Sequence, residues 1–105
     1  MRLQSGAPSL GAASARLHAL GSNRYAGELR VANRGRAGAW LFLSVPGATA
    51  IVLREPESGR VLYRGGAADD LPVGRIAAGA VRTVEVELRP AGGRPLGFRW
   101  SAAAV

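Results

Sequence analysis

The residues of this chain that could do chemistry are few and lie far apart in the sequence. His18 is the only histidine, and the partners that a catalytic triad or a metal site requires are not near it. The adjacent acids Asp69 and Asp70 could bind a hard cation through their carboxylate oxygens. Two acids directly before Leu71-Pro72 are, however, more typical of a turn. We therefore expect a solvent-facing His18 and a turn at Asp69-Asp70.

Three glutamates alternate with apolar residues and could form carboxylate pairs. Glu85 and Glu87 would share one strand face about 7 Å apart, because each residue of a strand rises ~3.4 Å. Glu28 points outward in the same way from an earlier strand. Nothing around these acids in the sequence indicates a cleft, so a solvated strand face is favoured over an acid–base pair.

Glycine-rich and aromatic residues offer two further kinds of site. Gly65-Gly66 and Gly92-Gly93 lack the lysine and the following helix of a phosphate-binding loop. Trp40, Phe98 and Trp100 could form a carbohydrate platform, but their alternation with polar residues favours the core. The parts needed for catalysis are missing, so the sequence predicts no enzymatic activity, no cofactor and no metal ion.

The elements that would position these residues are short strands. Glycine- and proline-rich turns recur at the spacing of roughly 8–12 residues that is typical of β-sandwiches and barrels. Between them, apolar and polar residues alternate with a period of two. This predicts an all-β fold, a two-sheet antiparallel sandwich of about eight strands, immunoglobulin-like or jelly-roll-like. The strands are expected at residues 15–20, 25–31, 40–45, 51–53, 61–63, 71–76, 83–89 and 98–101.

Two strands have a predictable place in their sheet. Residues 40–45 are apolar on both faces and predict a central strand. Pro72 cannot donate to a ladder and predicts an edge strand at residues 71–76. The predicted core consists of Leu29, Val31, Trp40, Phe42, Ile51, Leu53, Tyr63, Val84, Val86, Leu88, Phe98 and Trp100.

The last two strands are expected to form a hairpin over residues 90–94. In that pairing Glu85 and Glu87 would face Arg99 across the strands. Earlier in the chain, Asn33-Arg34-Gly35 predicts a turn, because Asn33 and Gly35 tolerate positive φ.

Length and charge limit the organisation and the partners. The chain has 105 residues, enough for one domain, and a net charge of +7 carried entirely by arginines. The arginines are dispersed along the sequence and are expected on both sheets. We therefore predict weak polyanion contact and no specific nucleic-acid binding. No apolar run approaches the ~20 residues of a membrane span, and the absence of cysteine excludes disulfides.

Four stretches of the chain form an ordered set of short motifs: LRVANRG (residues 29–35), LYRG (62–65) with Asp70-Leu71, VGRIAAGAVR (73–82) and FRWSA (98–102). In order and spacing they resemble the motifs of the camelysin/TasA-like family of secreted bacterial matrix proteins. Two departures are Ala78, where the family usually has proline, and Gly21-Ser22, which lacks the family's Pro-Gly-Asp.

The resemblance implies a non-catalytic structural protein of the cell surface or extracellular matrix, able to form fibres by strand donation. Some family members are described as metalloendopeptidases, but the single histidine and scattered acids of this chain supply no metal-ligand set. An extracellular or cell-surface location is expected, although no apolar secretory segment follows Met1. The alternative is a non-catalytic module that binds a polyanion or a glycan.

The N-terminal segment is the expected assembly element. Residues 1–20 would form one or two strands with a flexible linker at residues 5–14, and residues 21–105 would form the sandwich. A ten-residue flexible linker spans roughly 16–19 Å, which allows the first strand to reach a neighbouring copy or to fold back on its own domain. The apolar residues expected at the contact are Met1, Leu3, Leu17 and Leu20.

Overall fold

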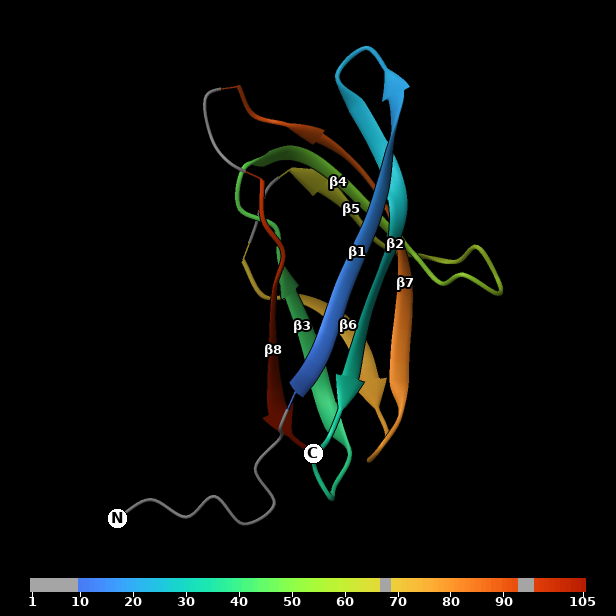
Figure 1. The fold of residues 1–105 in the computed structure, drawn as a ribbon, viewed down its shortest axis with the longest axis vertical. Coiled ribbons are helices and arrows are strands. Elements are labelled where there is room, and N and C mark those ends of the chain that lie inside the picture. Colours follow the sequence, from blue (N-terminus) through green and yellow to red (C-terminus); the bar gives the residue numbers. More distant parts are fainter. Residues whose placement is uncertain (1–9, 67–68, 93–95) are drawn as a thin grey trace.

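The computed structural model describes residues 10–66, 69–92 and 96–105 of the chain. Within these ranges there is no helix long and apolar enough to cross a membrane. Eight strands pair antiparallel in two layers (Figure 1), which confirms the predicted all-β sandwich. The strands are β1 (Leu10–Gly21), β2 (Arg24–Asn33), β3 (Ala39–Ser44), β4 (Ala48–Arg54), β5 (Val61–Gly66), β6 (Leu71–Ile76), β7 (Val81–Pro90) and β8 (Arg99–Ala104).

The order of the strands is that of a jelly roll with its first strand moved. One sheet has the order β1-β2-β7-β4-β5 and the other the order β6-β3-β8. In a jelly roll the first strand lies beside the eighth, in the sheet that also holds the third and the sixth. Here β1 lies beside β2 instead. As a result β8 is an edge strand, paired only with β3 among the described strands.

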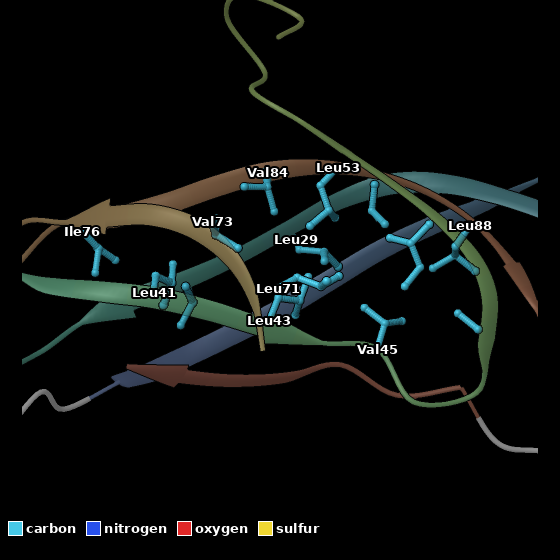
Figure 2. Packing of buried hydrophobic residues seen from close by; sticks show 14 of the residues in the cluster. Leu29, Leu41, Leu43, Val45, Leu53, Leu71, Val73, Ile76, Val84 and Leu88 are labelled. Carbon is cyan, nitrogen blue, oxygen red and sulfur yellow. The ribbon is translucent and has the colours of Figure 1, made fainter. Parts of the chain in front are cut away.

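The core lies between the two sheets and is almost entirely aliphatic (Figure 2). Seven predicted core residues are buried, whereas Tyr63, Phe98 and Trp100 are only half-buried against the cluster. The seven confirmed residues are Leu29, Val31, Ile51, Leu53, Val84, Val86 and Leu88. The buried residues absent from the predicted core are Ala39, Leu41, Leu43, Val45, Ala48, Leu71, Val73 and Ile76.

The prediction for β3 placed the wrong face toward the core. Leu41 and Leu43 are buried, while Trp40 is 44% exposed and Phe42 is half-buried on the outer face. A strand exposes alternate residues on opposite sides, so an error of one residue exchanges the two faces. The central position of β3 and the edge position of β6 are both as predicted.

The first two strands form a tight hairpin that the sequence analysis missed. Ser22 and Asn23 have φ values of 54° and 58°, as a two-residue type I′ turn requires. Gly27 lets β1 approach closely, because a Cβ atom there would lie 1.8 Å from the carbonyl oxygen of Arg16. The linker predicted at residues 5–14 is wrong for residues 10–14, which belong to β1. Residues 5–9 lie outside the described part.

The hairpin predicted between the last two strands is also wrong. β7 and β8 belong to different sheets, so Glu85 and Glu87 do not face Arg99. The segment between Pro90 and Arg99 crosses from one sheet to the other, and the Gly97 amide donates to the carbonyl oxygen of Pro46 at 2.9 Å.

Asn33 joins the end of β2 to two neighbouring segments. It is 1% exposed, and it does not adopt the positive φ that the predicted turn would allow. Its side-chain amide donates to the carbonyl oxygens of Ala37 (3.0 Å), Ile76 (3.3 Å) and Ala77 (3.2 Å). Its side-chain oxygen accepts a bond of 2.9 Å from the Gly35 amide. A single buried side chain therefore connects the five-stranded sheet to β6 of the other sheet.

Candidate functional site

The five-stranded sheet carries most of the strand charges. Its strands contain seven arginines and three glutamates, whereas the strands of the three-stranded sheet contain two arginines and no acid. The arginines lie on both sheets, as expected, but seven of the nine in strands belong to the five-stranded sheet. Strand pairing brings residues that are distant in sequence into rows across the outer face. Two neighbouring rows are Arg16–Glu28–Glu85–Arg54 and His18–Ala26–Glu87–Val52–Arg64.

The three predicted glutamates meet on this face. Glu28 lies directly opposite Glu85, and Glu87 is two residues further along β7. Like charges opposite each other are destabilising, but Arg16 and Arg54 occupy the two ends of the row and offset them. The predicted solvated face is only partly correct, because Glu85 and Glu87 are half-buried.

Glu87 is the centre of an ion-pair cluster. Its carboxylate accepts a hydrogen bond from the guanidinium group of Arg24, and Arg54 lies 3.7 Å away. The hydrogen bond from Arg24 lowers the pKa of Glu87 below its ordinary value, and the charges of Arg24, Arg54 and Arg64 act in the same direction. Glu87 is therefore a fixed carboxylate at neutral pH and not a proton donor.

A second ion-pair cluster lies directly after the end of β4, around Glu55. Glu55 accepts bonds of 3.1 Å from both Arg60 and Arg82, and Arg82 also donates to the carbonyl oxygen of Val73 at 3.0 Å. These arginines, Arg82 first, lower the pKa of Glu55. Because Val73 belongs to β6, the hydrogen bonds of this cluster connect the β4–β5 loop and β7 to the three-stranded sheet.

The structure also shows the surroundings of the other two titratable candidates, His18 and Asp70. His18 is exposed on β1, as predicted. Asp70 lies in the bend before β6 with a φ of 54°, and its backbone amide donates to the side-chain oxygen of Ser44 at 2.9 Å. Its carboxylate accepts a weak bond of 3.4 Å from Ser101. Among the described residues, no group of three His, Cys, Asp or Glu side chains could hold a metal ion.

The three aromatic residues considered as a platform lie on different faces. Trp40 is on the outer face of the three-stranded sheet, where the guanidinium group of Arg75 stacks 5.5 Å from its ring centre. Phe98 and Trp100 are half-buried and pack against the core. They line a hollow of about 190 Å³ together with residues 13–15 of β1. The residues that line this hollow come from β1, from β8 and from the segment just before β8.

The predicted assembly residues are divided between two regions. Leu17 is half-buried against the core, and Leu20 is 44% exposed near the tip of the β1–β2 hairpin. Met1 and Leu3 lie outside the described residues. The segment 15–20 is paired with β2 of its own chain, which corresponds to the self-paired alternative for this part of the N-terminus.

No family model, curated protein or solved structure matches the chain in comparisons with known proteins.

The structure also brings together residues that the sequence analysis did not select. Arg24, Arg64 and Arg89 come from three strands and surround one hollow with Glu87. A signal was present in the sequence, because all three alternate with inward-facing residues of their strands. Only the register between strands, which a single sequence does not supply, places them together.

Proposed function

We propose that this protein is a non-catalytic structural module of the cell surface or extracellular matrix, which assembles with copies of itself by adding a strand to the open edge of β8. The observation that carries the proposal is this edge. β8 is paired on one side only among the described strands, so its other side presents unpaired backbone groups.

The side chains at the edge favour an added strand. Phe98 and Trp100 are half-buried and border the hollow between β8 and β1. A strand lying beside β8 would cover their exposed parts and remove apolar surface from water, at roughly 25 cal/mol per Å². It would also take the place that the first strand has in a jelly roll.

The donor in this proposal is the segment of residues 1–9. β1 itself is paired with β2, so the donated strand must precede it. Nine extended residues span up to roughly 30 Å, which is enough to reach a neighbouring molecule. Leu3 would supply the apolar contact. A head-to-tail contact of this kind does not close on itself and would grow into fibres.

The resemblance to camelysin/TasA-like matrix proteins supports the same function and an extracellular or cell-surface location. The residues that could do chemistry support a non-catalytic role. His18 is exposed and lines a hollow with Glu28, Glu85 and Glu87, while Glu55 and Glu87 are held as carboxylates by arginines. Carboxylates with pKa values lowered in this way are suited to holding a fold and not to moving protons at neutral pH.

The test uses two variants that each lack one half of the contact. Replacing residues 1–9 with a glycine–serine segment of equal length removes the donor. Ala102→Glu places a charge on the inward face of β8 and blocks the acceptor. Each variant alone should stay monomeric in light scattering and electron microscopy at concentrations where the full chain forms fibres. Mixed together, they should form dimers that do not grow.

The outcomes separate this arrangement from other contacts. Far-UV circular dichroism checks that both variants keep their strands. Leu20→Ser is the matched control for Leu3→Ser, because Leu20 is exposed but lies away from β8; only Leu3→Ser should reduce fibre length. A full chain that remains monomeric at high concentration, or a folded mixture that contains no dimers, would show that strand addition at β8 is wrong.

A further inference from the structure

A hollow of about 340 Å³ opens on the outer face of the five-stranded sheet, over β7, β4 and β5. Two adjacent rows of paired residues form it. One row is Glu87–Val52–Arg64 and the next is Arg89–Ala50–Gly66. Gly66 has no side chain and Ala50 has a small one, so the second row leaves space in the middle of the face.

The wall of the hollow is strongly basic. Arg24, Arg64 and Arg89 line it, and among the described residues of the lining Glu87 is the only acid. Glu87 is already engaged by Arg24 and Arg54. Arg64 and Arg89 form no ion pair with any acid of the described residues. Three positive charges against one negative charge leave the lining with a net charge of +2.

The floor of the hollow is apolar. Val52 is half-buried and Ala50 is exposed beside it. A ligand that matches the hollow therefore needs anionic groups toward the arginines and an apolar surface toward the floor. It also needs hydroxyl groups, because Glu87 is a fixed carboxylate that accepts hydrogen bonds. An acidic sugar combines these features, since its ring has an apolar C–H face, hydroxyl groups and a carboxylate.

We propose that this hollow, the arginine cleft, binds an acidic oligosaccharide through its carboxylates. Guanidinium groups bind carboxylates through paired, charge-assisted hydrogen bonds. The floor contributes contact with the sugar ring, and Glu87 selects for hydroxyl groups. The site is independent of the proposed strand addition, because the arginine cleft and β8 belong to different sheets.

Nucleic acid fits the arginine cleft less well. Single-stranded nucleic acid is bound by aromatic side chains that stack on bases, and no aromatic residue lines the cleft. Glu87 would also repel a phosphate chain that runs over the floor.

The experiment measures binding of trigalacturonate to the full chain by calorimetry, with maltotriose as the neutral sugar and hexathymidylate as the phosphate probe. Trigalacturonate should bind, maltotriose should bind at least about tenfold more weakly, and added salt should weaken the acidic probe. The double variant Arg64→Gln/Arg89→Gln should lose about tenfold or more in affinity for trigalacturonate, because it removes two charge-assisted contacts.

The matched control is Arg16→Gln/Arg30→Gln, which removes the same charge from exposed positions of the same sheet outside the cleft. It should change the affinity less than about twofold. Ala50→Phe fills the floor without changing charge and should also abolish binding. Equal losses in the two double variants would mean that the general positive field binds the sugar. Absent binding of trigalacturonate, or tighter binding of hexathymidylate, would equally overturn the proposal.

Discussion

The two sheets share one core, but the side chains on their outer faces differ in chemical character. The five-stranded sheet presents arginines and glutamates, of which Arg24 and Arg54 pair with Glu87 across the strands, whereas the three-stranded sheet presents Trp40, Phe42 and Pro72 with Arg75 stacked on the first of them. The difference shows that charged side chains are not distributed uniformly over the surface. Ten of the twelve charged residues in the strands lie on the five-stranded sheet, and the outer face of the other sheet is more apolar.

The largest effects on the free energy of unfolding are expected in the core, to which both sheets contribute fully buried leucines. Leu43 of β3 and Leu53 of β4 both have 0% exposure, so each Leu→Ala change should lower the free energy of unfolding by about 2–5 kcal/mol. Urea denaturation followed by tryptophan fluorescence would measure both. A cost in only one sheet would show that the two layers do not unfold as one unit.

The connection between the sheets is tested at Asn33. Asn33→Ala removes the side-chain amide that donates to the carbonyl oxygens of Ile76 and Ala77, which should cost about 1–3 kcal/mol of unfolding free energy. Thermal unfolding gives the measurement, and Asn23→Gly is the control, because glycine keeps the positive φ of the turn and the change removes one exposed bond of 3.3 Å. An equal cost at both positions would contradict the linking role of Asn33.

The two tryptophans separate the inner face from the outer face of the smaller sheet. Trp100 packs against the core, so Trp100→Ala should cost about 2 kcal/mol, whereas Trp40→Ala should cost below about 1 kcal/mol. Chemical denaturation of the two variants, followed by circular dichroism, measures the difference. A larger cost for Trp40→Ala than for Trp100→Ala would show that Trp40, and not Trp100, packs against the core.

The smallest expected effect is a pH dependence of stability, which arises from Glu87 in the five-stranded sheet and Glu55 in the β4–β5 loop. The folded pKa values of Glu55 and Glu87 are lowered by their arginines. The stability that they contribute is therefore complete above the ordinary pKa of about 4.3 and is lost as the pH falls through the lower folded values. Glu55→Gln/Glu87→Gln should flatten the decline of the urea midpoint between pH 5 and pH 3, while Glu57→Gln should leave it unchanged.

The sequence predicted which segments are strands, because alternation at Val84, Val86 and Leu88 has only one explanation. It did not predict the inner face of β3, because residues 40–45 are apolar on both sides and either phase satisfies the pattern. The pairing of β7 also escaped prediction, since alternation describes one strand and carries no information about its neighbour.

The candidate sites depended even more on register. Arg24, Arg64 and Arg89 are separated by 40 and 25 residues along the chain. Only the pairing of β2, β7, β4 and β5 brings them around one hollow. The open edge of β8 could not be predicted from the sequence for a related reason. The expected hairpin placed β8 beside β7 in one sheet, so the edge position of β8 in the three-stranded sheet was not predicted.

The position of β1 has a mechanical consequence. β1 begins and β8 ends at the same end of the sandwich (Figure 1), so a pull applied to residues 10 and 104 would act across the strands and not along them. Backbone bonds of the β1–β2 ladder run across the strands, and such a load would break them one after another from residue 10. The first strand should therefore peel away at low force, while a pull between the β1–β2 turn and residue 104 would shear many bonds together.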